Sequence, residues 1–187
     1  MIDFTNCFTK LTGNPPFHWQ EELFKRFIGG AIPSECDVPT GLGKTSTIAI
    51  WLLALAQSLM AQQATRKIPR RLVYVVDRRI IVDQSTDEAQ RVIGVLEEAG
   101  SKGISHSENP LGPVAKAFRE TTFTKDGPLV ALSTLRGQLA EDREWCLDPS
   151  RPAIIIGTVD MIGSRLMFSG YGGLGRSHRS LQAGLLG

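Results

Sequence analysis

The segment VPTGLGKTS, at positions 38–46, constrains the fold more than any other part of this chain. Gly41 and Gly43 precede Lys44 and Thr45, and a run that is apolar on nearly every side follows to about Met60. Because glycine adopts backbone conformations that other residues avoid, the pattern predicts a tight loop that opens directly into a helix. A helix that is apolar all round has to be buried. We therefore expect a loop followed by a helix that packs on a β-sheet.

Short apolar runs alternate with amphipathic stretches along the rest of the chain. Strands are predicted at 72–76, 129–132, 153–156 and, more weakly, 31–38. Helices are predicted at 17–28, 44–60, 81–96, 114–119 and 161–168. Strands without polar interruption are typical of a sheet that is covered on both faces. The sequence therefore predicts an α/β fold, with a parallel sheet and helices on both of its faces.

Composition and charge exclude several classes of protein. Hydrophobic residues make up 42% of the 187 positions and charged residues 21%, which excludes a disordered chain. The net charge of +2 gives no general case for a nucleic-acid partner, so such a partner has to be argued from local residues. The three cysteines and three histidines are scattered, without the spacing of a disulfide framework or a zinc site. The longest apolar run, 48–56, is about half a membrane span, so we expect a cytoplasmic protein with no membrane partner.

The 38–46 segment also has the chemistry of a phosphate-binding loop. Its backbone N–H groups are expected to surround a polyphosphate, and the candidate ATP-binding residues are Thr40, Gly41, Leu42, Gly43, Lys44, Thr45 and Ser46. Lys44 is expected to bridge the β- and γ-phosphates and the Thr45 hydroxyl to bind Mg²⁺, so these two are the candidate catalytic residues. Val38 stands where the full pattern has a glycine. The alternative is a glycine-rich turn that binds nothing.

A second part of the nucleotide site is predicted upstream, in the segment PFHWQEELF. The amide of Gln20 donates and accepts hydrogen bonds at once, which suits the N6 and N7 edge of adenine. Phe17 is expected to pack nearby. Taken without the phosphate loop, Gln20 would be an exposed polar residue on an amphipathic helix.

Five segments in a fixed order resemble a known family of proteins. They are an aromatic residue three positions before Gln20, then PTGLGKT, VVDRRIIVDQ, STLRGQ and GTVDMIGSRLMF. They resemble the ordered motifs of the first RecA-like domain of superfamily 2 helicases. The later segments resemble the helicase-nuclease of type I CRISPR systems, in its subtype U/G variant. The resemblance extends from about Phe17 to the last residue and implies a RecA-like P-loop NTPase fold.

The resemblance also implies what the whole protein does. Residues 1–187 would be the N-terminal portion of RecA-like domain 1, without the second RecA-like domain and the HD nuclease domain, which would lie on the rest of the helicase-nuclease chain. Such a helicase uses ATP to unwind DNA and feeds single-stranded DNA to the nuclease. A CRISPR surveillance complex would recruit it in antiviral defence.

Five residues match positions that contact nucleic acid in such motors. By the resemblance, they are Arg79, Thr134, Arg136, Gly137 and Thr158. Arginines, hydroxyls and backbone amides that follow parallel strands converge on one edge of a sheet, which is where ligands bind. The alternative for the two arginines is that each is a solvated surface residue.

Four other side chains have simpler expected roles. The three tryptophans, Trp19, Trp51 and Trp145, are predicted to pack in the core or at its rim rather than to stack on bases. Asp160 either caps the helix that follows it or contacts nucleic acid. We therefore do not count these residues as site candidates.

An ATPase of this kind needs one carboxylate for Mg²⁺ and one to activate water. The only Asp-Glu pair, Asp87–Glu88, falls on the polar side of the helix predicted for 81–96, so it is predicted to be a solvated helix face. The chain is then expected to stop before the Walker B strand and to bind nucleotide weakly without turnover. The alternatives are another superfamily 2 DNA or RNA motor, a small-molecule kinase or other P-loop phosphotransferase, and a binding module without turnover.

Overall fold

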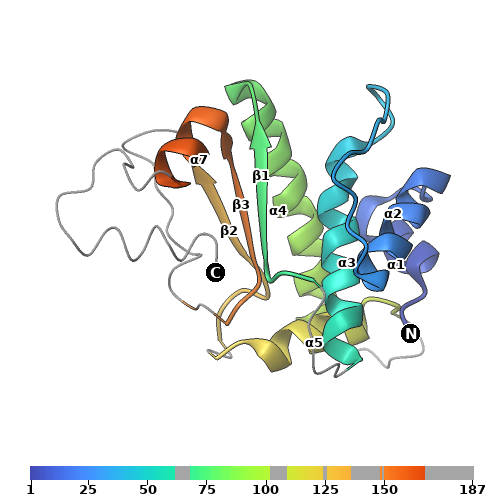
Figure 1. Ribbon diagram of the computed structural model, residues 1–187. Coiled ribbons are helices and arrows are strands. Elements are labelled where there is room, and N and C mark those ends of the chain that lie inside the picture. Colours follow the sequence, from blue (N-terminus) through green and yellow to red (C-terminus); the bar gives the residue numbers. More distant parts are fainter. Residues whose placement is uncertain (62–67, 102–108, 124–125, 136–147, 149, 167–187) are drawn as a thin grey trace. The chain divides into compact units, whose positions relative to one another are not determined.

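The computed structural model describes residues 1–61, 68–101, 109–123, 126–135, 148 and 150–166, and the chain divides into two compact units. The helical unit consists of Met1–Arg70 and Arg91–Thr121. The sheet unit consists of Arg71–Gln90 and Thr122–Gly187. One long helix, α4 (Arg79–Ser101), contributes residues to both units (Figure 1).

The helical unit is built around one buried helix. Its elements are α1 (Phe4–Thr12), α2 (His18–Gly29), η1 (Lys44–Ser46), α3 (Thr47–Met60), the second part of α4 and α5 (Gly112–Thr121). Helix α3 packs against α1, α2 and α5, and its residues from Ile48 to Ala56 are all buried. This explains why its sequence is apolar on every side. None of the helices in the described ranges combines the length and apolar character that a membrane crossing requires.

Helix α1 was not predicted, although its sequence carries the signals of a helix. The Asp3 carboxylate accepts a hydrogen bond from the backbone N–H of Asn6 at 3.1 Å and so caps the first turn. The buried residues of α1 follow helical spacing: Phe4, Cys7, Phe8 and Leu11. Burial raises the pKa of the Cys7 thiol to about 11, with a smaller contribution from Asp3. This thiol therefore stays protonated at neutral pH and is no nucleophile.

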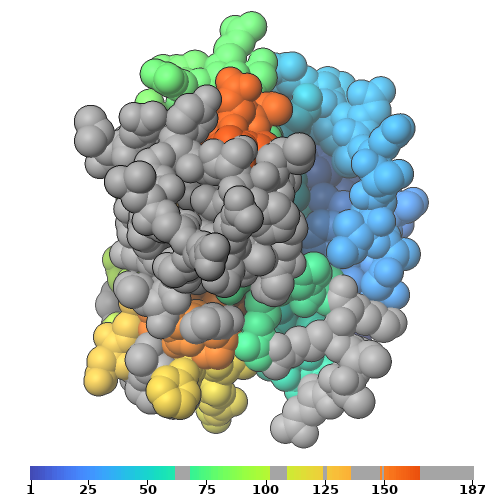
Figure 2. All heavy atoms as spheres, turned by 60° about the vertical axis from the view of Figure 1, so that its left-hand side comes forward, coloured from blue at the N-terminus to red at the C-terminus, as the bar shows by residue number. Residues whose placement is uncertain are grey.

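The weak strand prediction at 31–38 is wrong. These residues form no strand, and most of them are exposed; Figure 2 shows the light-blue stretch of chain that contains them at the molecular surface. Pro33 has no N–H for a strand ladder, and polar residues follow it directly. Only Val38 is buried, with 7% of its surface exposed, immediately before the glycine-rich loop.

The sheet unit contains three parallel strands in the order β1-β3-β2. They are β1 (Arg71–Val76), β2 (Ala131–Leu135) and β3 (Ala153–Thr158), so the strands predicted at 72–76, 129–132 and 153–156 are all present and β2 begins two residues later than expected. Strand β3 is buried, whereas β1 is only partly buried. Val76 pairs with Thr158, and Leu135 pairs with Gly157. The carboxyl ends of all three strands therefore lie at one edge of the sheet (Figure 1).

Helices cover both faces of this sheet, as predicted. Helix α7 (Val159–Leu166) packs Ile162 against a cluster that contains Leu135 and Ile155. Neighbouring residues of a strand point to opposite faces, and Thr134 contacts Thr86 of α4, so α4 covers the other face. A Cβ on Gly157 would lie 3.1 Å from the Leu135 Cβ and 3.3 Å from Ile162, so glycine permits the close approach of α7.

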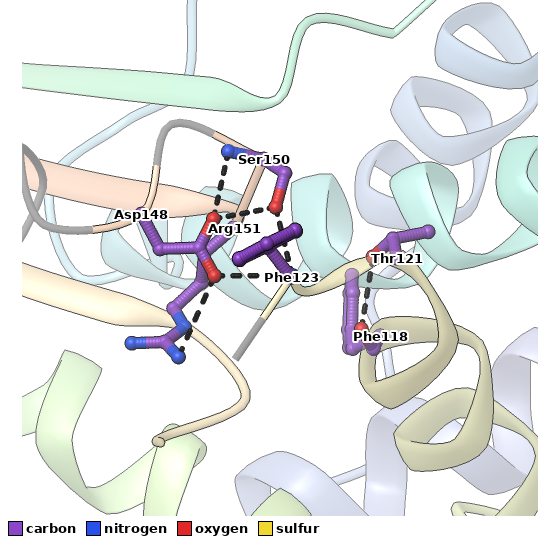
Figure 3. A network of polar contacts seen from close by, with 6 residues as sticks. All are labelled: Phe118, Thr121, Phe123, Asp148, Ser150 and Arg151. Carbon is purple, nitrogen blue, oxygen red and sulfur yellow. Dashed lines mark hydrogen bonds and ion pairs between the residues drawn. The ribbon is translucent and has the colours of Figure 1, made fainter. Parts of the chain in front are cut away.

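A buried ion pair organises the turn that leads into β3. The Asp148 carboxylate lies 3.7 Å from the Arg151 guanidinium, and the two side chains are 4% and 6% exposed. The same carboxylate accepts hydrogen bonds from the backbone N–H of Ser150 at 3.0 Å and from that of Phe123 at 3.2 Å. Figure 3 shows these contacts converging on the two carboxylate oxygens. The pair thus ties the start of β3 to the segment that leads into β2.

Candidate phosphate-binding site

The loop before α3 has the backbone conformation that its glycines suggested. Gly41 and Gly43 have φ angles of +89° and +74°, in the left-handed region that costs other residues about 1–2 kcal/mol. A Cβ on Gly43 would also lie 3.1 Å from the side-chain nitrogen of Gln20 and 3.4 Å from the Ser46 hydroxyl. The backbone angle at position 43 therefore strongly favours glycine, and any side chain there would also press on the Gln20 amide.

Two side chains of α2 hold two successive carbonyl groups of this loop. The indole N–H of Trp19 donates to the Leu42 carbonyl at 3.1 Å. The Gln20 side-chain amide donates to the Gly43 carbonyl at 3.4 Å. The loop carbonyls at these two positions therefore point toward α2.

The peptide groups that these bonds orient have their N–H groups on the opposite side. In a planar trans peptide the C=O and N–H bonds point in opposite directions, and the described residues contain no cis peptide. The N–H groups of Gly43 and Lys44 therefore face away from α2. In the described part of the chain, no acceptor is found for the amides of Gly43, Lys44 and Thr45. Successive free amides of this kind form an anion-binding concavity.

The charged and hydroxyl groups of the motif lie in the same loop. Lys44 is exposed and makes no ion pair with another described residue. Thr45 is half-buried, and the Thr47 hydroxyl donates to the Lys44 carbonyl at 2.7 Å, which closes the first turn of the helix. The seven predicted ATP-binding residues, Thr40 to Ser46, are consecutive and lie in this loop and in η1, so their binding role stays a prediction.

Gln20 is not the exposed polar residue that the alternative to adenine recognition assumed. Its side chain is 2% exposed, and its carbonyl oxygen accepts a hydrogen bond from the Phe17 backbone N–H at 2.8 Å. With its nitrogen bonded to Gly43, the amide already has a partner at each end. Recognition of adenine by Gln20 stays a prediction, and because the side chain is buried it requires the amide to become accessible to the base. Phe17 is half exposed, so its ring remains accessible to a base.

The roles predicted for two tryptophans have different outcomes. Trp51 is buried in α3 and donates its indole N–H to the Pro69 carbonyl at 3.1 Å, which confirms core packing. Trp19 is half-buried on α2, but its hydrogen bond to Leu42 makes it part of the candidate site. The feature of the sequence that could have indicated this role is the position of Trp19, one residue before Gln20. Trp145 lies outside the described residues.

The described carboxylates of the sheet unit differ from a conventional acidic pair. Asp87 and Glu88 lie within α4 and Asp87 is exposed, which confirms that they belong to a helix face. Asp77 follows β1 directly and forms an exposed ion pair with Arg78 at 3.6 Å; sequence reasoning had not singled it out. Asp160 is exposed in the first turn of α7. Within the described ranges, no group of three His, Cys, Asp or Glu residues could hold a metal ion.

The predicted nucleic-acid contacts are only partly brought together. Arg79 is exposed at the start of α4, and Thr158 ends β3, so both lie at the carboxyl edge of the sheet. The Thr86 hydroxyl donates to the Val82 carbonyl at 2.8 Å, so the Thr134 hydroxyl, 3.1 Å away, is the donor of the bond between the two threonines. Thr134 would have to break that bond to donate to a phosphate. Arg136 and Gly137 lie outside the described residues.

Comparison of the chain with protein-family models, with curated proteins and with solved structures gave no match. Fold and site together define an α/β protein with a small parallel sheet and a glycine-rich loop whose free amides face away from α2. The functional assignment therefore rests on the local chemistry of this loop.

Proposed function

We propose that the loop Thr40–Ser46 binds the triphosphate of ATP together with Mg²⁺. The supporting observation is the orientation of the Gly43 and Lys44 amides, which α2 turns away by holding the carbonyls of Leu42 and Gly43. Amides at the start of a long helix favour a negatively charged ligand further.

Each group of the loop has a defined task in this proposal. The amides of Gly43, Lys44 and Thr45 donate to phosphate oxygens, and the Lys44 ammonium group neutralises their charge. The Thr45 hydroxyl provides an oxygen ligand for Mg²⁺, and the remaining ligands would come from phosphate and water. Bound Mg²⁺ would neutralise charge that develops on the phosphates. The exposed ring of Phe17 is available to pack against the base.

The same proposal extends to a motor that acts on nucleic acid. By its resemblance to superfamily 2 helicases, the chain would be the ATP-binding part of a CRISPR-associated helicase-nuclease that moves along single-stranded DNA. Arg79 and Thr158 support this, because both lie where the carboxyl ends of parallel strands offer a ligand site. A binding module without turnover is the second candidate, since β1 is followed directly by a single carboxylate, Asp77, and β3 by a single carboxylate, Asp160 in the first turn of α7. ATPase activity stimulated by single-stranded DNA supports the motor, and nucleotide binding without turnover supports the module.

Replacing Lys44 by alanine is expected to weaken ATP binding by about 10–100-fold, because charge-assisted hydrogen bonds of this kind contribute about 1.5–3 kcal/mol. Isothermal titration calorimetry with ATP and Mg²⁺ measures this effect. Lys25→Ala is the matched control, because Lys25 is an exposed lysine on α2 of the same unit, outside the loop. Equal affinity of the wild type and Lys44→Ala, or no binding by the wild type at millimolar ATP, would contradict the proposal.

A further inference from the structure

We infer that Trp19 is a positioning residue whose indole N–H sets the direction of the Gly43 amide in the phosphate-binding loop. The inference rests on the proposed function, because it concerns the same loop. It adds a residue that the phosphate-loop motif does not contain. The Trp19 indole N–H donates a hydrogen bond to the Leu42 carbonyl of the loop, at 3.1 Å.

Trp19 is attached to a rigid part of the molecule. Helix α2 buries Leu23, Phe24 and Phe27, and the Phe24 ring stacks on that of Phe4 with centroids 4.4 Å apart. The helix also packs along α3. The indole donor is therefore held in place by the core of the helical unit, independently of any ligand.

The loop itself has few restraints of its own. Thr40, Gly41 and Leu42 are exposed, and the Leu42 N–H makes only a long bond of 3.5 Å to the Pro39 carbonyl. Glycines on both sides of Leu42 make the backbone permissive. The peptide between Leu42 and Gly43 thus needs an external contact to fix its direction, and Trp19 provides it. Ordering the loop before the ligand arrives lowers the entropy lost on binding.

Trp19 and Gln20 contribute unequally to this restraint. The bond from Gln20 to the Gly43 carbonyl is 3.4 Å long, near the limit for a hydrogen bond, whereas that from Trp19 is 3.1 Å. The Gln20 bond also acts on a different peptide, because the Gly43 carbonyl belongs to the Gly43–Lys44 peptide, where it already accepts from the Ser46 N–H at 3.0 Å. We therefore expect Trp19 to make the larger contribution to the orientation of the Gly43 amide.

The test removes the indole donor and keeps an aromatic ring. Trp19→Phe is expected to bind ATP with Mg²⁺ about 3–10-fold more weakly than the wild type, as expected from the loss of one neutral hydrogen bond. It should lose the same factor in affinity for inorganic tripolyphosphate, which has no base. Calorimetry with the two ligands separates the positioning of phosphate-binding amides from stacking on the base.

Trp51→Phe is a closely matched control. Trp51 also donates its indole N–H to a backbone carbonyl at 3.1 Å, but the acceptor is Pro69, outside the loop. This variant is expected to melt at a lower temperature and to keep the wild-type affinity for both ligands. In the wild-type protein, the Trp19 indole signal in a ¹H–¹⁵N spectrum should shift on titration with tripolyphosphate while the Trp51 signal stays in place. Because this titration uses the wild-type protein, its result does not depend on whether a variant folds.

The outcomes distinguish the inference from the proposed function. A loss confined to ATP places Trp19 at the base and overturns the inference, and so does unchanged affinity of Trp19→Phe for both ligands. In both cases binding by the wild type leaves the proposed function standing. If the wild type binds neither ATP nor tripolyphosphate, the proposed function fails and the inference fails with it.

Discussion

Replacing Gly43 by alanine is expected to reduce the affinity for ATP and Mg²⁺ by about 100-fold or more. The φ angle of +74° is strained for alanine by about 1–2 kcal/mol. The new Cβ would also lie 3.1 Å from the Gln20 side-chain nitrogen, so the bond that holds the Gly43 carbonyl would shift. Each amide that then turns away from the phosphate forfeits about 1.5–3 kcal/mol. Calorimetric titration with ATP and Mg²⁺ measures the loss.

Gly13→Ala separates backbone strain from the phosphate-binding role. Gly13 follows α1 with a φ angle of +79°, and a Cβ there would meet nothing within 4 Å. In both variants the left-handed backbone conformation strains the alanine, so the free energy of unfolding measured by chemical denaturation should fall by about 1–2 kcal/mol. Only Gly43→Ala should lose affinity for ATP. A fall in affinity shared by both variants would show that general destabilisation, and no particular loop geometry, governs binding.

Replacing Asp148 by alanine is expected to have the largest effect on stability, a loss of about 3–5 kcal/mol in the free energy of unfolding. The variant leaves the Arg151 guanidinium buried at 6% exposure without its carboxylate. It also removes the carboxylate that accepts from the backbone N–H of Ser150 and shares that of Phe123 with the Ser150 hydroxyl. For a chain of this size the melting temperature should fall by roughly 6–20 °C.

Asp77→Ala is the control for the effect of the ion pair. The Asp77–Arg78 pair has a similar separation of 3.6 Å, but both side chains are 77% exposed. Exposed pairs contribute between about 0 and 1 kcal/mol, because water already solvates both charges. Urea denaturation of the two variants should therefore give clearly different midpoints. Similar losses for both would show that burial of the Asp148–Arg151 pair has no special consequence.

Local patterns in the sequence predicted much of the fold. The apolar runs at 72–76 and 153–156 became β1 and β3, because the strands of a covered sheet have few polar interruptions. Strand β3 is buried almost throughout, whereas β1 is only partly buried and Val75 is 44% exposed. The nearly all-apolar stretch after Lys44 became α3, the most buried helix of its unit. The strand order β1-β3-β2 could not be predicted, since it depends on which strands meet in space.

The partners of polar groups could be predicted only in part. Glycine at positions 41 and 43 indicated the loop conformation, because the requirement is a property of each residue alone. The bonds from Trp19 and Gln20 to the loop join positions 23 residues apart, and no local pattern encodes them. For the same reason the bond between Thr86 and Thr134, which occupies a predicted nucleic-acid contact, was not foreseen.

The ¹H–¹⁵N spectrum of the protein during titration with ATP and Mg²⁺ tests the central proposal most directly. The amides of Gly43, Lys44 and Thr45, which have no acceptor among the described residues, should show the largest shifts, with one common binding curve. The amide of Gly13, which has the same left-handed conformation outside the loop, should not move. Saturable shifts that gather elsewhere and leave Gly43, Lys44 and Thr45 unchanged would contradict a phosphate-binding role for this loop.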